Sequence, residues 1–178
     1  KGKIKDCNIV FIAVPTPTTP GGFDYRTIKQ ALSKISRGKI AIIKSTVLPG
    51  TTELIQKENK EIIVLHAPEF LSENTAARDA AFPDRNIIGM PEDTAEHRKA
   101  AKLLLSILPK APYEKICSSR EAELIKYARN TLGYVRVVFT NVLYNVAGSI
   151  GADWSVIQEA LSADPQNGPT YSNPIHKS

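Results

Sequence analysis

The fold class is decided by an apolar stretch near the start of the chain, Asn8-Ile9-Val10-Phe11-Ile12-Ala13-Val14, which ends at Pro15. An uninterrupted run of this kind predicts a strand that is buried on both faces, as in a parallel sheet. The segment from Tyr25 to Ile35 then carries apolar residues at the i, i+3, i+4, i+7 spacing of a helix packed on that sheet. A strand followed by such a helix favours a layered α/β fold.

Strands and helices continue to alternate along the chain. Further strands are predicted at 39–44, 61–65, 86–90 and 113–117, and helices at 51–58 and 93–108. Thr51 or Thr52 is the expected cap of the first of these helices. The second would pack through Ala100, Leu103, Leu104 and Ile107. The stretch 67–83 shows little helical periodicity and is expected to be a loop.

The last third of the chain has a different pattern. From Ser119 to Ile150 no proline interrupts apolar residues spaced alternately by three and four. A helix of this length extends about 48 Å, which is long for so small a sheet domain to cover. We expect part of it to pack against a partner chain or a further domain, the alternative being that it lies wholly on its own domain. A short helix is predicted at 153–161 and a loop from 162 to 178.

Composition and charge narrow the function classes. Lys and Arg exceed Asp and Glu by 23 to 18, but they are spread along the chain, which argues against nucleic-acid binding. No apolar run approaches the roughly 18 residues that span a bilayer, and residues 1–6, which have no small-residue cleavage site before the first strand, are not expected to be a signal peptide. The two cysteines, Cys7 and Cys117, are expected to be buried free thiols in a protein of the reducing cytoplasm. Because Met90 is the single methionine, the chain does not begin at its own initiator, and we expect a segment upstream.

Polar residues follow three of the predicted strands. They are Pro15-Thr16-Pro17-Thr18, Ser45-Thr46 and His66-Ala67-Pro68-Glu69. Because the carboxyl ends of parallel strands meet at one edge of a sheet, these groups are expected to share one rim, where α/β proteins bind ligands. No metal site is predicted there or elsewhere.

Five motifs in order carry a family resemblance. They are Val14-Pro15-Thr16-Pro17-Thr18, Lys44-Ser45-Thr46-Val47 with Pro49-Gly50-Thr51-Thr52, Pro68-Glu69-Phe70-Leu71-Ser72-Glu73, Pro83-Asp84-Arg85, and Glu123-Leu124-Ile125-Lys126-Tyr127-Ala128-Arg129-Asn130-Thr131. Together they resemble the UDP-glucose/GDP-mannose dehydrogenase family, whose NAD-dependent members oxidise the C6 alcohol of a nucleotide sugar to a carboxylate. The similarity runs from about Cys7 to Asp164.

The resemblance implies a set of site residues. Catalytic residues would be Thr46, Glu69, Glu73, Lys126 and Asn130; NAD would contact Pro15, Thr16, Thr18, Ser45, Thr46 and Glu73; and the nucleotide sugar, of the UDP-glucose class, would contact Glu69, Phe70, Leu71, Lys126 and Asn130. Lys126 and Asn130, one helical turn apart, would stabilise an oxyanion. Glu69 would transfer protons during hydrolysis, and Thr46 would hold a water molecule or contact NAD. Without the family, the threonines would be turn and strand-end residues, and the glutamates and Lys126 solvated surface.

The resemblance also implies the domain organisation and its gaps. Residues 1–118 would form a partial Rossmann-like NAD-binding domain without its first βαβ unit, 119–164 a central helical region that makes a homodimer through the helix at 119–150, and 165–178 a tail. The chain has no G-x-G-x-x-G, no nucleophilic cysteine at the family's position, and Gln166 where the family has arginine. We therefore expect the isolated chain to be catalytically silent. The alternative is a truncated dimerisation or nucleotide-sugar-binding module.

Overall fold

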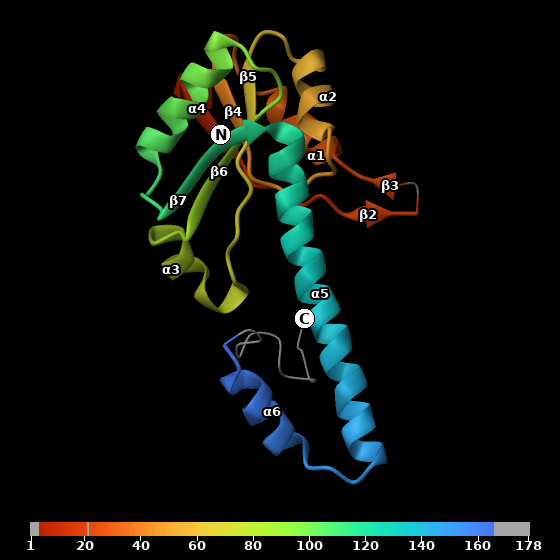
Figure 1. The fold of residues 1–178 in the computed structure, drawn as a ribbon. Coiled ribbons are helices and arrows are strands. Elements are labelled where there is room, and N and C mark those ends of the chain that lie inside the picture. The colour runs from red at the N-terminus through yellow and green to blue at the C-terminus, as the bar shows by residue number, and fades with distance from the viewer. Residues whose placement is uncertain (1–3, 21, 166–178) are drawn as a thin grey trace. The chain divides into compact units, whose positions relative to one another are not determined.

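The computed structural model of the chain describes residues 4–20 and 22–165 (Figure 1). Its strands are β1 (Ile9–Ile12), β2 (Thr18–Thr19), β3 (Gly22–Phe23), β4 (Ile40–Ile43), β5 (Ile63–His66), β6 (Arg85–Met90) and β7 (Tyr113–Ser118). Its helices are the short 3-10 turns η1 (Ile4–Asp6) and η2 (Glu73–Thr75) and the α-helices α1 (Arg26–Leu32), α2 (Thr51–Glu58), α3 (Ala76–Ala81), α4 (Ala95–Ile107), α5 (Ser119–Ser149) and α6 (Trp154–Ala163). The chain divides into two compact units, Lys1–Tyr127 and Ala128–Ser178, and α5 contributes residues to both.

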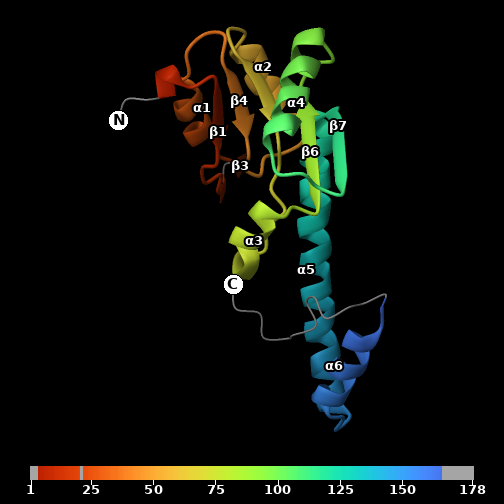
Figure 2. The same cartoon turned by 90° about the vertical axis from the view of Figure 1, so that its left-hand side faces the viewer.

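The first unit is built on a five-stranded sheet in the order β1-β4-β5-β6-β7 (Figure 2). β1, β4 and β5 run parallel, with Ile12 beside Ile43 and Ile43 beside His66. The three strands therefore end at one level, and the segments that follow them leave the sheet at one edge. We call residues 13–16, 44–46 and 67–69 the carboxyl edge.

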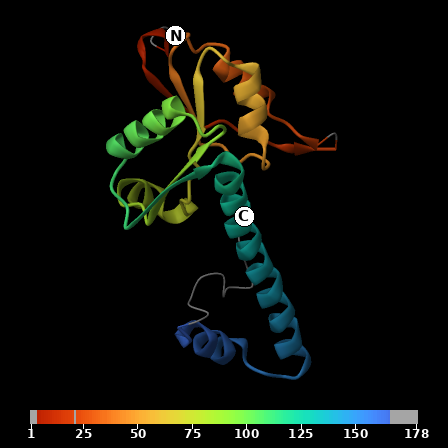
Figure 3. The same cartoon turned by 45° about the horizontal axis from the view of Figure 1, so that its top comes forward.

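Helices cover both faces of this sheet. Ala41 and Ile43 of β4 pack in a core with α1 and α2, whereas Ile42 between them packs with α4 on the opposite face. This is the alternation that a strand imposes on its side chains. Figure 3 shows α4 (green) and α2 (orange) on opposite sides of the strands. The arrangement is the Rossmann-like α/β fold that the sequence predicts.

The first strand is less covered than its apolar sequence predicts. Ile12 is buried, but Phe11 is 46% exposed, so the expectation of a strand buried on both faces is wrong. Among the described residues β1 pairs with β4 alone and forms an edge of the sheet. Phe11 shares its face with Ile9, and α4 packs on that face mainly against β5 and β6, which leaves the edge strand at the margin of the layer.

The connection after β5 corrects the prediction in two respects. The stretch expected to be a loop contains η2 and α3. β6 then enters the sheet antiparallel to β5, with Gly89 beside His66, and β7 runs parallel to β6. The predicted parallel sheet is thus correct for β1, β4 and β5 and wrong at β6. The physical reason is that the connection keeps the chain near the carboxyl edge, so β6 begins on that side.

Two helix details also differ from prediction. The residue before α2 is Gly50, at φ 93°, and neither Thr51 nor Thr52 is its cap. In α4 the buried residues are His97, Ala100, Ala101 and Leu104, whereas the predicted Leu103 and Ile107 are about half exposed. The imidazole of His97 lies 3.0 Å from the Gln56 side chain of α2, and this buried polar contact places His97 toward the core.

The second unit contains the later part of α5 and the short helix α6. Asp153 caps α6 by accepting a hydrogen bond from the Ser155 amide, and the rings of Tyr144 and Trp154 meet edge to face with centroids 5.6 Å apart. Both predicted helices are therefore confirmed. Gln166, which stands where the family resemblance predicts an arginine, lies outside the described residues. One face of α5 here is apolar and exposed, and its members are Leu132, Val135, Phe139, Val142 and Val146.

Candidate functional site

The carboxyl edge brings together the segments that follow β1, β4 and β5. Two hydroxyls tie the first two of these segments to each other. Ser45 Oγ accepts from the Val14 amide at 2.9 Å and donates to the Val14 carbonyl at 2.7 Å. Thr16 Oγ1 donates to the Thr46 carbonyl at 2.8 Å. Ser45 is buried and both of its hydrogen bonds are internal, so its hydroxyl has a structural role in this edge.

Lys126 reaches this edge from the beginning of α5. Its side chain is buried, and its ammonium donates to the Glu69 carbonyl at 2.7 Å and lies 3.6 Å from the Glu69 carboxylate. A buried cation is stable only with such partners. The two residues that the family resemblance assigns to one site are therefore in contact, although the site role of each stays a prediction.

Two further titratable groups lie beside this pair. Lys44 follows β4, and burial lowers its pKa, an effect that Glu69 opposes and Lys126 reinforces. His66 ends β5 and is fully buried, and neither ring nitrogen has a hydrogen-bond partner among the described residues. Burial and the positive charge of Lys44 lower the pKa of His66 to about 3. At neutral pH this histidine is uncharged.

The Phe70 ring is contacted by two cations. The Arg85 guanidinium lies 4.6 Å from the ring centroid, and the Lys126 ammonium lies 5.9 Å from it. Arg85 begins β6, so the antiparallel entry of that strand brings its guanidinium to the loop after β5. Phe70 and its neighbour Leu71 are half-buried. Their predicted contact with substrate is untested.

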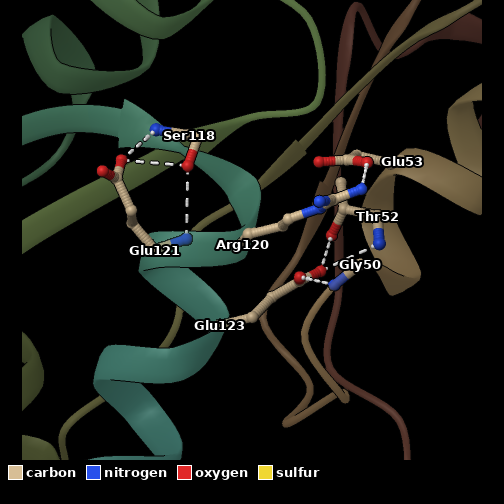
Figure 4. Close-up of polar contacts among 7 residues, drawn as sticks. All are labelled: Gly50, Thr52, Glu53, Ser118, Arg120, Glu121 and Glu123. Atoms are coloured by element: carbon tan, nitrogen blue, oxygen red, sulfur yellow. Dashed lines mark hydrogen bonds and ion pairs between the residues drawn. The ribbon is translucent and has the colours of Figure 1, made fainter.

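A buried carboxylate joins α5 to the beginning of α2 (Figure 4). Glu123 accepts from the Gly50 amide at 2.6 Å, from the Thr52 amide at 2.8 Å and from the Thr52 hydroxyl at 2.6 Å. The carboxylate thus satisfies amides that the helix leaves unpaired, and its charge suits the positive end of the helix dipole. Burial raises the pKa of Glu123, and the three hydrogen bonds oppose that rise.

The close approach of α5 to the sheet depends on Gly89. A Cβ added at Gly89 would lie 2.7 Å from Ala122 Cβ and 2.8 Å from Ser119 Cα. Both distances are shorter than side chains tolerate, so only glycine lets the first turn of α5 contact β6 here. The helix that carries Glu123 and Lys126 is seated on the sheet through this position.

The four remaining predicted residues are exposed, and of these only Pro15 belongs to the carboxyl edge. Pro15 and Thr18 are exposed, Thr18 within the small β2–β3 hairpin that the sequence did not predict. Glu73 is exposed in η2, and no hydrogen bond or ion pair links it to Glu69 or Lys126 within the described ranges. Asn130 is exposed on α5 in the second unit. The predicted roles of these four residues are untested.

The prediction that both cysteines are buried is wrong. Cys7 is exposed and Cys117 is half-buried, and neither is in a disulfide. Burial raises the pKa of the Cys117 thiol to about 11, so it is protonated at neutral pH. In the part of the chain that the structure describes, no three His, Cys, Asp or Glu side chains gather as metal ligands. No helix there has the length and apolarity needed to cross a membrane.

Three contributors to this site were missed by sequence reasoning. Lys44 and His66 belong to the motifs at the ends of the strands, and Glu123 is the first residue of the last motif, but the sequence pattern assigns a role to none of them. A charged residue directly after an apolar strand is a usable signal for Lys44. A glutamate three residues before Lys126 is on the same side of the helix, which is a weaker signal, because its partner Thr52 is 71 positions away.

The order and direction of β1, β4 and β5, with helices on both faces, place the chain among Rossmann-like α/β proteins, which bind ligands at the carboxyl edge of the sheet. Residues 1–107 match the NAD-binding domain of the UDP-glucose/GDP-mannose dehydrogenase family, and residues 120–176 match the central domain of that family. The chain belongs to the UDP-glucose/GDP-mannose dehydrogenase family.

Individual relatives agree with this assignment. UDP-glucose 6-dehydrogenase 1 of Arabidopsis thaliana is 32% identical over 94% of this chain and 39% of the relative, and UDP-glucose 6-dehydrogenase of Rickettsia bellii is 31% identical over 96% of this chain and 41% of the relative. The structure of a UDP-glucose dehydrogenase from the hyperthermophilic archaeon Pyrobaculum islandicum superposes with a TM-score of 0.81 at 33% identity, covering 95% of this chain and 42% of that one. The chain spans about two-fifths of the length of these relatives.

NAD is the cofactor of this family, and the donor set at the carboxyl edge fits part of it. The Thr16 hydroxyl donates to the Thr46 carbonyl there, whereas the Thr46 hydroxyl has no hydrogen-bond partner among residues 4–20 and 22–165. The amides at the beginning of α2 do not fit a pyrophosphate, because Glu123 already binds them. The Thr46 hydroxyl therefore fits a hydrogen bond to the dinucleotide, whereas the amides at the beginning of α2 do not.

Proposed function

We propose that the chain is a portion of an NAD-dependent nucleotide-sugar 6-dehydrogenase of the UDP-glucose type, which oxidises a C6 alcohol to a carboxylate. In this proposal the carboxyl edge binds sugar and cofactor, and Lys126 holds the substrate oxygen on which negative charge develops. The observation that carries it is the buried ammonium of Lys126 directed at Glu69 on that edge. A desolvated cation stabilises such an oxygen far better than a solvated one.

The chemistry assigned to this chain follows from its own side chains. The Lys126 ammonium donates to the Glu69 carbonyl, and its charge favours an alkoxide over an alcohol at an oxygen beside it. Asn130 would add an amide donor to the same oxygen. The Glu69 carboxylate, within 3.6 Å of the ammonium, is the base that would take a proton from water. NAD, when bound, supplies the hydride acceptor.

For the 178-residue chain itself, the proposal is binding without turnover. The first oxidation needs NAD held in place through its pyrophosphate, and no G-x-G-x-x-G occurs in the chain to hold it. Conversion of the aldehyde to a carboxylate in this family's chemistry needs a thiolate nucleophile. Burial raises the pKa of Cys117 to about 11, and Cys7 precedes β1, at the end of the strand opposite the carboxyl edge. Neither thiol meets the requirement.

Titration calorimetry with UDP-glucose tests the binding proposal. Wild type is expected to bind, and Lys126→Met, which keeps side-chain length and removes the charge, is expected to lose about tenfold or more in affinity. The matched control Lys102→Met, at an exposed position of α4, should bind like wild type. A wild type that binds no UDP-glucose would refute the substrate role, and accumulation of NADH with UDP-glucose and NAD would refute the absence of turnover.

We propose in addition that the protein forms a homodimer through the helix at 119–150. Support comes from the exposed apolar stripe on α5, whose members Leu132, Val135, Phe139, Val142 and Val146 repeat at intervals of three and four. This is the spacing of helices that pack against a second helix. The stripe also favours the second candidate function, a dimerisation module without catalysis. Free cysteines favour a reducing compartment, and we propose the cytoplasm.

Sedimentation velocity tests the dimer. Wild type is expected to sediment as a dimer and Phe139→Asp as a monomer, since a buried charge at the centre of the stripe is costly. Asn141→Asp places the same charge at an exposed polar position of the same helix and should remain dimeric. A monomeric wild type would eliminate this proposal.

A further inference from the structure

Glu123 is a fully buried carboxylate to which neither the sequence motifs nor the proposed chemistry gives a role. We propose that Glu123 is a positioning residue, which fixes the position of the Lys126 side chain relative to Thr46 at the carboxyl edge. The inference rests on the proposed function, because that function gives Lys126 and Thr46 their importance.

The helix that carries Glu123 does not need it in order to begin. Ser118 and Glu121 form a reciprocal capping box at the start of α5: the Glu121 carboxylate accepts from the Ser118 amide at 2.8 Å, and Ser118 Oγ accepts from the Glu121 amide at 3.3 Å (Figure 4). The Glu123 carboxylate is therefore directed outward from a helix that is already capped, toward another element.

That element leads directly to the carboxyl edge. Glu123 binds the amides of Gly50 and Thr52, and Gly50 is separated from Thr46 by only three residues. The left-handed conformation of Gly50, at φ 93°, directs its amide at the carboxylate without side-chain strain. A displacement of α5 would therefore also displace the segment that contains Thr46.

The other end of the connection is Lys126. It follows Glu123 by three residues, so the two side chains lie on the same side of α5. Lys126 binds the Glu69 carbonyl in the segment after β5. One helix face is thus held at two places: Lys126 binds Glu69 of the carboxyl edge, and Glu123 binds Gly50 and Thr52, which follow the part of that edge that contains Thr46.

A second link between α5 and α2 provides a contrast. Arg120 forms an ion pair with Glu53 at 2.7 Å, and the Arg120 side chain is 67% exposed. Exposed ion pairs contribute little to holding two elements in place, whereas removal of one partner from a buried, hydrogen-bonded group is felt strongly. The positioning role therefore belongs to Glu123.

The test compares Glu123→Gln with Glu53→Gln in the full 178-residue chain. Each sample is treated with an N-hydroxysuccinimide acetate, and the acylation rate of Lys126 is read by peptide mass spectrometry relative to the exposed Lys57 on α2. In Glu123→Gln the amide nitrogen of the new side chain faces the donors of Gly50 and Thr52, so the hydrogen bonds that hold α5 to this segment are weakened. The relative acylation rate at Lys126 is then expected to rise about tenfold. In Glu53→Gln the rate should stay within about twofold of wild type.

The outcomes separate this inference from the proposed function. A folded Glu123→Gln whose Lys126 is acylated at the wild-type rate overturns the inference, as does a uniform rise at Lys57 and Lys126. If Glu123→Gln does not fold, Thr52→Val, which removes only the hydroxyl donor, decides the matter by the same two criteria. Calorimetry with UDP-glucose is run on the same samples. A faster Lys126 in a protein whose wild type binds no UDP-glucose leaves the positioning intact and removes the substrate role.

Discussion

The uncharged state of His66 predicts a specific acid sensitivity. The pKa of this fully buried ring is about 3, whereas in the unfolded chain it returns to the ordinary value of 6.5. Because the folded-state pKa is the lower one, the stability contributed by neutral His66 is complete above pH 6.5 and is lost as the pH falls toward 3. At pH 4.5 His66 is therefore protonated in the unfolded chain and neutral in the folded chain.

The size of the effect follows from that difference. Each unit between the pH and 6.5 costs about 1.4 kcal/mol, so lowering the pH from 7 to 4.5 should remove about 2.5 kcal/mol of unfolding free energy through His66 alone. Glu123 titrates differently, since its raised pKa acts in the opposite direction. A comparison with His66→Leu cancels this contribution, because Glu123 is present in both proteins. Leucine suits a site whose ring nitrogens have no partner among the described residues.

The assay is urea denaturation followed by circular dichroism at pH 7 and pH 4.5, at constant ionic strength. Wild type should lose about 2.5 kcal/mol more than His66→Leu on acidification. As a direct check, the ring resonances of His66 should not titrate between pH 7 and pH 4. Equal losses of stability in the two proteins, or a His66 resonance that titrates near pH 6.5, would refute the reasoning.

Three other predictions concern packing, thiol reactivity and a buried polar network. Gly89→Ala should lower the free energy of unfolding by about 1–3 kcal/mol, because its Cβ would meet the first turn of α5 at 2.7 Å; an unchanged thermal transition would contradict this. At pH 8 a disulfide reagent should modify the exposed Cys7 readily and Cys117 hardly at all, since the Cys117 pKa is about 11, and equal rates would disprove it. Gln56→Leu should cost about 1–3 kcal/mol in urea denaturation, because it leaves a buried amide of β5 and a buried carbonyl without their partner, and a neutral result would count against this network.

Much of the fold can be read from the chain because its signals are local. Helix α2 begins and ends where its pattern predicts, and α5 differs by one residue, since apolar periodicity and the absence of proline act within a few turns. The direction of β6 could not be read this way. An apolar pattern indicates a strand but does not indicate the direction in which the strand runs. The antiparallel entry of β6 depends on the connection after β5, which ends near the carboxyl edge.

The candidate site, too, could be predicted from the sequence only in part. The motifs place Glu69 and Lys126 in one site, and the structure brings them into contact across 57 positions of sequence. The role of Glu123 was not readable, because a lone glutamate on an amphipathic helix is ordinarily solvated. Only the folding of the Gly50 turn against α5 turns it into a buried acceptor of three hydrogen bonds.

The sequence by itself determined the family, the alternation of strands and helices, and the polar residues that end the parallel strands. These follow from local spacing and residue type. Tertiary structure alone decided the charge states and partners at and beside the carboxyl edge: the neutral His66, the half-buried Lys44 and the Glu123 carboxylate that caps α2. The physical reason is that burial and hydrogen bonding set the cost of a charge, and both are fixed by neighbours that lie far apart in the chain.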